Sequence, residues 1–366
     1  MIEHTIYLNN SEGMPLSQGV IDAMATQFSQ KLPNSKALCQ IYAAIDASDE
    51  DTLVITSSGA EAINHVITSV YFDGMGSKEH LLVGSTSEAA SVMACGRCES
   101  FGATSTVVPV NEKGIITAEA VREAMTPRTR LLSLPWVDGL TGVIHPIEEI
   151  VSVCRERGVL LHLDITHAIG KLQGNLQGDY ITFDGAPFGA PVGTGAVLIR
   201  QGRLLSPMIQ GGVEQAGFRA GGVNGALLAG LGQAAFEAVE KCDFVCTEVA
   251  RLRDKLEASL VDFVGAQPLM VEGERLPNCT AMAFPAVCGE ALAYALEKAK
   301  VAVSIGGGSF QQLKTLLKTC GVESSLANSA LSFSLGANNT EEDVLRTVDV
   351  ITEAVSSLRK LSEQIK

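Results

Sequence analysis

The stretch LHLDITHAIGKL, residues 161–172, contains three side chains that could do chemistry. Asp164 ends an apolar run, His167 follows it, and Lys171 comes near the end of the stretch. An imidazole can donate a hydrogen bond or act as a base near neutral pH, and a carboxylate can hold a protonated partner. Asp and His are also common in turns as capping or packing residues, so a structural role is the alternative for both.

A second stretch, DGAPFGAPVGTGAV at 184–197, is rich in glycine and begins with Asp184. It contains no lysine, and the chain has none between Lys171 and Lys241. No histidine follows His167. A reaction that needs an amine or a further imidazole from this part of the chain therefore finds no side chain to supply it.

The nine cysteines are scattered, and only Cys95 and Cys98 form a CxxC pair. A structural zinc site needs a second pair at ligand spacing, which the sequence lacks, so neither zinc binding nor redox use is favoured. An odd number of thiols suits a reducing compartment. The N-terminal MIEHTIYLNNSEG shows no basic leader with an apolar core, so we expect a cytoplasmic protein without a metal site.

The formal net charge is -14 and the isoelectric point is near 4.9. No segment gathers Lys and Arg on one face, so binding to nucleic acid or to an anionic membrane is not expected. Apolar runs fall short of the roughly 18 residues that a membrane-spanning helix needs. The expected partners are small molecules or other proteins.

Apolar, β-branched runs alternate with amphipathic segments through residues 51–200. Strands are predicted at 51–56, 80–84, 105–110, 129–137, 159–164, 179–184 and 195–200, and helices at 58–72, 87–102, 117–125 and 146–158. Alternating strands and helices require crossover connections, which predicts an α/β fold with a mostly parallel sheet covered on both faces.

An Ala- and Leu-rich stretch at 224–260 predicts one long helix that leaves this sheet. Beyond it, strands are predicted at 280–285, 301–306 and 331–336 and helices at 290–300, 311–321 and 340–360. A chain of 366 residues is long for one core, since domains average roughly 150 residues. We expect a large domain at 16–250 and a smaller α+β domain made of 1–15 and 251–366.

Six segments resemble those of the cysteine desulfurase branch of the class V aminotransferases, which are fold-type I pyridoxal phosphate enzymes. They are IYLNNSEGMPL, TSSGAEAIN, LHLDITHAIGKL, FRAGGVNGALLAGLG, RLPNCTAMAFP and LSFSLGANNTEED. In the same order they are similar to the family's YLDNAATTPL, TSGATEAxN, HVDxxQxxGK, RSGT, RLPN and RxSLxxxxTEED. Because the order is kept almost without gaps, the resemblance extends from end to end of the chain.

The resemblance implies a fold-type I aminotransferase-like fold and an obligate homodimer with two pockets at the subunit interface. A cofactor phosphate would lie at the amino end of the helix that begins near Gly59, where free N–H groups and the helix dipole favour an anion. Asp164 would face the pyridinium nitrogen of the cofactor. His167 stands where the family has a glutamine that touches the ring hydroxyl, and it could donate a similar hydrogen bond.

Desulfuration in this family requires a lysine, a nucleophilic cysteine and an arginine that binds the substrate carboxylate. The lysine, in SGHKxxGPxGxGA, falls on Pro187, the cysteine on Ser309 and the arginine on Ser332. Proline has no amine to form an imine, and an alcohol oxygen cannot form a persulfide. Lys171 matches a separate GK position that we interpret as structural, and Cys320 lies farther along the chain than the family cysteine.

Three more pocket positions differ from the family in a direction that disfavours the cofactor. Glu88 replaces the stacking ring, Ala60 replaces a threonine, and Asp184 replaces a hydroxyl that binds phosphate. A phosphate beside Asp184 would meet a repulsion of roughly 1 kcal/mol per charge in water and up to about 4 kcal/mol near a protein surface. We therefore expect no cofactor, with pyridoxal phosphate bound non-covalently as the alternative.

These substitutions predict a dimeric pseudoenzyme that has lost desulfurase activity and has a scaffold or regulatory role. One alternative is a lysine-independent pyridoxal phosphate enzyme that uses His167 and Asp164. Another is a pocket in which Glu88, Asp164 and Asp184 bind a metal ion or an amine. The expected protein partners are a second copy of the chain, an active desulfurase relative or a sulfur-carrier protein.

Overall fold

The computed structural model describes residues 5–30, 33–174 and 176–365. Its largest sheet has seven strands in the order β2-β8-β7-β6-β5-β3-β4. The strands are β2 Thr52–Thr56, β3 His80–Gly84, β4 Thr104–Val108, β5 Thr129–Pro135, β6 Leu160–Asp164, β7 Tyr180–Asp184 and β8 Gly195–Ile199. Only β8 runs antiparallel to its neighbours, so the prediction of a mostly parallel sheet is confirmed.

Helices cover both faces of this sheet because successive strand residues point to opposite sides. On one face, Leu81 and Val197 pack in a cluster with α3 Gly59–Asp73 and α4 Ala89–Glu99. On the other face, Leu82 and Leu198 join a second cluster. Its helices include α2 Ser35–Ala44, α6 Ile147–Arg157 and α7 Gly225–Glu240, while α1 Gln18–Gln30 contacts α7 and α5 Ala118–Ala124 contacts α6 and β4.

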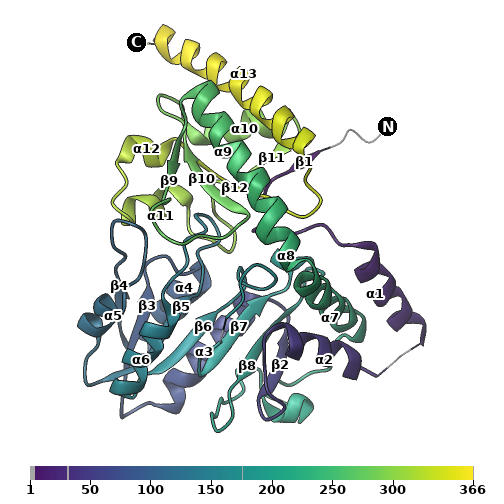
Figure 1. The fold of residues 1–366 in the computed structure, drawn as a ribbon. Coiled ribbons are helices and arrows are strands. Elements are labelled where there is room, and N and C mark those ends of the chain that lie inside the picture. Colours follow the sequence, from purple (N-terminus) through teal and green to yellow (C-terminus); the bar gives the residue numbers. More distant parts are fainter. Residues whose placement is uncertain (1–4, 31–32, 175, 366) are drawn as a thin grey trace.

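The C-terminal elements form a separate group at one end of the molecule, above the large sheet in Figure 1. An antiparallel sheet has the order β12-β10-β9, and β1 pairs in parallel with β11. The strands are β1 Ile6–Tyr7, β9 Gln267–Leu269, β10 Cys279–Ala283, β11 Val301–Ala302 and β12 Ala330–Ser334. The helices are α9 Ala250–Val264, α10 Gly289–Lys298, α11 Leu313–Thr319, α12 Ser324–Asn328 and α13 Glu341–Ile365.

The N-terminal strand β1 belongs to this C-terminal group through both pairing and packing. Ile6 and Leu8 are buried in the cluster that includes Leu256 of α9 and Val348 of α13. The contacts agree with grouping the first residues with the C-terminal part, while the domain limits at 16 and 250 stay a prediction. Within the described ranges, no helix has the length and apolar character needed to cross a bilayer.

The prediction of one continuous helix across 224–260 is wrong. The chain forms α7, a short turn α8 at Cys242–Phe244, a π-helical turn at Val245–Val249, and then α9. A π turn holds one more residue than an α-helical turn and so changes the direction of the side chains that follow. Leu231 of α7 packs under the large sheet, whereas Leu256 of α9 packs in the C-terminal cluster. The break lets each helix bury its apolar side in a different core.

The contact between α2 and α7 generates a stability prediction. A Cβ atom at Gly232 would lie 2.5 Å from Cα of Ala37, so the two helix backbones could not keep their spacing. We expect Gly232→Ala to lower the free energy of unfolding by about 1–3 kcal/mol, measured by urea denaturation. Gly96→Ala in α4 is the matched control, because its Cβ meets no described atom within 4 Å. It should stabilise the protein by up to about 1 kcal/mol, and equal effects of the two changes would contradict the prediction.

Candidate functional site

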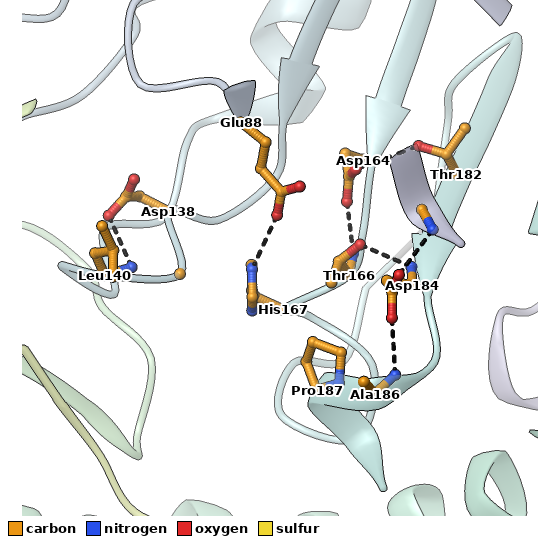
Figure 2. A network of polar contacts seen from close by, with 12 residues as sticks. Glu88, Asp138, Leu140, Asp164, Thr166, His167, Thr182, Asp184, Ala186 and Pro187 are labelled. Carbon is orange, nitrogen blue, oxygen red and sulfur yellow. Dashed lines mark hydrogen bonds and ion pairs between the residues drawn. The ribbon is translucent and has the colours of Figure 1, made fainter. Parts of the chain in front are cut away.

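Four acidic side chains follow the carboxyl ends of neighbouring strands of the large sheet. Asp164 and Asp184 are the last residues of β6 and β7, while Asp138 follows β5 and Glu88 follows β3. This edge is where open α/β sheets bind ligands. Figure 2 shows these four residues and His167 around one region, so the structure brings together the predicted Glu88, Asp164, His167 and Asp184.

The carboxylate of Asp184 binds the amino end of α3. Its Oδ2 accepts a hydrogen bond from the backbone N–H of Gly59 at 2.8 Å, and its Oδ1 accepts one from Ala186 at 2.9 Å. The backbone N–H of Asp184 donates to Oγ1 of Thr166 at 3.0 Å. The helix end predicted to bind a cofactor phosphate therefore binds a carboxylate of the chain itself. The helix dipole also favours a negative charge at this end.

The remaining contacts at the start of α3 also come from the protein. Ser58 is the N-cap, and its Oγ accepts from the N–H of Glu61 at 3.1 Å. The Glu61 carboxylate accepts from the N–H of Ser57 at 2.7 Å and pairs with Arg219 at 3.0 Å. The Arg219 and Ser57 hydrogen bonds hold the pKa of Glu61 low against the effect of burial. Ala60 is exposed and, as predicted from its type, brings no hydroxyl to this helix end.

His167 lies between an acid and an aromatic ring. Its Nε2 is 3.3 Å from Oε1 of Glu88, and its ring stacks on Phe310 with centroids 5.3 Å apart. Burial lowers the pKa of His167 to about 4, and burial together with Asp184 and Asp138 raises the pKa of Glu88 to about 8. Both shifts have the same cause, since burial disfavours the charged form of each group.

Asp164 and Asp138 hold the backbone of the turns that follow their strands. Oδ1 of Asp164 accepts from the N–H of Thr166 at 2.8 Å, and Oδ1 of Asp138 accepts from the N–H of Thr141 at 2.6 Å. Burial and the neighbouring Glu88 raise the pKa of Asp164 to about 7, and burial also raises the pKa of Asp138. The capping role considered for Asp164 is thus present in the structure.

The acidic side chains of the site contact groups of the chain itself. Across the residues that the structure describes, no group of three or more His, Cys, Asp or Glu side chains is placed to hold a metal ion. Asp184 and Asp164 direct their oxygens at backbone N–H groups, and Glu88 contacts His167. The metal-binding alternative therefore finds no support in the geometry.

Position 187, predicted to be that of the family lysine, lies in a 3₁₀ turn at Ala186–Phe188. The amine of Lys171 donates to the carbonyl oxygen of Pro187 at 3.2 Å. Lys171 is buried, and burial lowers the pKa of its ammonium group to about 8. Lys171 thus holds the turn that contains Pro187 by a backbone contact, in agreement with its interpretation as structural.

Ser309 and Ser332, the positions predicted for the family cysteine and arginine, both make structural contacts. The carbonyl of Ser309 accepts from the N–H of Ala89 at 3.0 Å, and Oγ of the buried Ser332 donates to the carbonyl of Leu140 at 2.6 Å. Burial raises the pKa of Cys320 to about 12, so this cysteine holds no thiolate at neutral pH.

The loop before Ser309 is shaped by three glycines. Gly306, Gly307 and Gly308 have φ angles of 76°, 98° and 64°, a region that side-chain-bearing residues rarely adopt. This backbone path carries Phe310 onto the ring of His167.

Sequence reasoning missed Asp138, Thr166 and Phe310. Asp138 follows a predicted strand in the same way as Asp164 and Asp184, so the rule that ligand sites lie at the carboxyl ends of parallel strands could have found it. Thr166 lies within the segment that was singled out for Asp164 and His167. Phe310 carried no signal, because its contact with His167 joins distant parts of the chain.

The fold and the arrangement of acids at the strand ends define a fold-type I aminotransferase-like protein. The model of the aminotransferase class-V family matches residues 3–347, and the chain therefore belongs to this family. A cysteine desulfurase of Gluconacetobacter diazotrophicus is 32% identical to it, over 98% of this chain and 95% of that protein. The cysteine desulfurase IscS of Methanosarcina thermophila is 28% identical, over 98% of this chain and 93% of its own length.

Solved structures agree with this fold. A NifS-like protein superposes with a TM-score of 0.91 at 24% identity, covering 97% of this chain and 100% of its own. A NifS-like protein from Rickettsia africae gives a TM-score of 0.86 at 21% identity, covering 96% and 100%. The fold class predicted from the sequence is thus confirmed.

Enzymes of this family depend on pyridoxal phosphate, and the residues at this site do not fit that group as a Schiff base. Pro187 has no amine, and the amine of Lys171 donates to a backbone carbonyl. Gly59 at the start of α3 already donates to Asp184. Some buried polar atoms near the site are compatible with a ligand: Nδ1 of His167 and the Oγ atoms of Ser85 and Ser87 have no hydrogen-bond partner among the described residues.

The raised pKa of Glu88 generates a prediction about pH. Since the folded pKa is about 8 and the usual value is 4.5, the folded protein holds more protons than the unfolded chain between these values. Stability should therefore fall as pH rises through this window. We expect Glu88→Gln to gain stability relative to the wild type, on the order of 2 kcal/mol, between pH 5.5 and 8.5, measured by thermal and urea unfolding.

Glu61→Gln is the control for this experiment. The pKa of Glu61 is lowered in the fold, so the stability that its ionised form contributes is complete above its unfolded pKa and is lost only as pH falls below that value. This variant should therefore be less stable than the wild type by a constant amount from pH 5.5 to 8.5. A stability difference for Glu88→Gln that is flat or that decreases with pH would contradict the prediction.

Proposed function

We propose that this class V aminotransferase-fold protein does not carry out pyridoxal phosphate-dependent cysteine desulfuration and serves as a dimeric scaffold or regulatory protein. The observation that carries the proposal is Pro187 at the position expected for the lysine, with the neighbouring Lys171 amine held by a backbone carbonyl. Without an amine, no covalent bond to the cofactor aldehyde can form at this position. The serines at 309 and 332 support the proposal, because they replace the groups expected to accept sulfur and bind the substrate carboxylate.

The proposed partner is a second copy of the chain. Three large apolar side chains on loops next to β8, Val192, Leu204 and Val213, are exposed by 87%, 82% and 88%. Contact with a second copy would remove exposed apolar surface of this kind from water, which favours association. Assembly with an active desulfurase relative or with a sulfur-carrier protein is a second form of the same role, and sedimentation of the purified chain, alone and mixed with such proteins, distinguishes these assemblies.

The proposal predicts a negative result in two assays. Purified protein mixed with pyridoxal phosphate should show only the absorbance of the free aldehyde, and it should release neither alanine nor sulfide from cysteine. An active cysteine desulfurase assayed in parallel is the positive control. Stoichiometric cofactor uptake that survives gel filtration, together with release of alanine, would overturn the proposal.

A lysine-independent reaction of non-covalently bound pyridoxal phosphate is a second candidate, favoured by the unpaired Nδ1 of His167. In this case His167 would act as the base and Asp164 would face the pyridinium nitrogen. Cofactor binding that changes the spectrum without an imine band, and that is lost in both His167→Ala and Asp164→Ala, would favour this candidate. An unchanged spectrum with excess cofactor would dispose of it.

A further inference from the structure

We infer that Asp184 is an internal anion that takes the place of a phosphate group at the amino end of α3 and keeps phosphate ligands out. The inference deepens the proposed function and rests on it in one respect, the absence of a lysine-bound cofactor. The inference concerns the binding of a phosphorylated ligand, whereas the proposed function concerns covalent chemistry with the cofactor.

The first argument is the set of donors that Asp184 uses. Its two oxygens accept from N–H groups of two different elements, Gly59 at the start of α3 and Ala186 in the turn after β7. Backbone N–H groups at the start of a helix are the donors that bind phosphate in proteins. An incoming phosphate would have to displace Oδ2 from Gly59 while facing the charge of the same carboxylate.

The second argument is that Asp184 is held in place. Its own N–H donates to Oγ1 of Thr166, and it ends β7, which is hydrogen-bonded to strands on both sides. The carboxylate cannot leave the helix end without breaking contacts to both Gly59 and Ala186. A side chain fixed in this way acts as a permanent ligand, because its binding needs no loss of translational freedom.

The third argument is the charge already present at this helix end. Glu61 accepts from the N–H of Ser57, so two carboxylates of the chain lie near the first turn of α3. Arg219 pairs with Glu61, and within the described part of the chain no Lys or Arg forms an ion pair with Asp184, the other carboxylate at this helix end. Removing the Asp184 charge should therefore change the affinity for anions, whereas the Glu61–Arg219 pair stays intact.

The test measures binding of inorganic phosphate to full-length protein by calorimetry at constant ionic strength. Wild type should show no binding or weak binding, and Asp184→Ser should bind phosphate about tenfold tighter or more, since it frees the N–H of Gly59 and removes the repulsion. Asp184→Asn keeps the size of the side chain and loses only its charge, so it should also bind more tightly than the wild type. If the serine variant does not fold, the asparagine variant provides the measurement.

Asp138→Asn is the matched control. It removes one negative charge from the same group of acids, but Asp138 binds the turn at Leu140 and Thr141 and not a helix end. It should leave phosphate binding as in the wild type. An equal gain of phosphate affinity in the Asp138 and Asp184 variants would mean that net charge alone causes the effect, and it would overturn the inference. Wild-type protein that binds phosphate as tightly as Asp184→Ser would also overturn it.

Hydrogen exchange at Gly59 gives a second readout. The amide should be protected in the wild type without any added anion, should exchange faster in Asp184→Ser, and should regain protection when phosphate is added. Exchange in Asp184→Ser that is as slow as in the wild type would contradict the inference.

Failure of the inference and failure of the proposed function are distinguishable. Imine formation with pyridoxal phosphate in the wild type would end the proposed function, whatever the phosphate titrations of the variants show. A wild type that stays colourless beside Asp184 variants that gain no phosphate binding would end the inference alone.

Discussion

The gathering of four acidic side chains at one edge of a sheet, with Asp138 and Asp164 buried and Glu88 and Asp184 half-buried, is the constraint on which this site depends. A carboxylate removed from water must receive hydrogen bonds or take up a proton. Asp138, Asp164 and Asp184 accept hydrogen bonds from backbone N–H groups, while burial raises the pKa of Glu88 to about 8, that of Asp164 to about 7, and that of Asp138 as well. The acidic side chains of the site are thus stabilised by donors from its own turns and by protonation.

The same contacts join the elements that form the site. Asp184 connects the turn after β7 to α3, Lys171 connects the preceding turn to the carbonyl of Pro187, and Phe310 covers His167 from the C-terminal group. Asp184 and His167 are at positions that the family resemblance assigns to the cofactor pocket, whereas Lys171 and Phe310 are not. All three contacts join elements of the fold to one another.

Much of the fold could be predicted because parallel strands covered on both faces appear as continuous apolar runs, such as HLLVG at 80–84. The places of Asp164 and Asp184 followed from their positions at the ends of such runs. The π turn at Val245–Val249 could not be predicted, because one extra residue in a helical pattern leaves composition and polarity unchanged. The contact of Phe310 with His167 depends on how the C-terminal group lies on the large sheet.

The hydrogen-bond partners of the substituted residues could not be predicted from the sequence either. The type of residue at 184 predicted repulsion of a phosphate, but only the structure shows that the carboxylate accepts from Gly59. Similarly, the exchange of an expected aromatic ring for Glu88 gave no indication that the acid lies beside His167. A pattern reports what a residue can do, whereas its partner is set by the tertiary fold.

The double contact of Asp184 has a consequence for how such a chain could change over generations. An amine introduced at position 187 would meet a site that still refuses phosphate, and loss of the carboxylate alone would admit a ligand with no amine to react with it. Pyridoxal phosphate chemistry in this chain would therefore require both changes together, in addition to changes at Ser309 and Ser332.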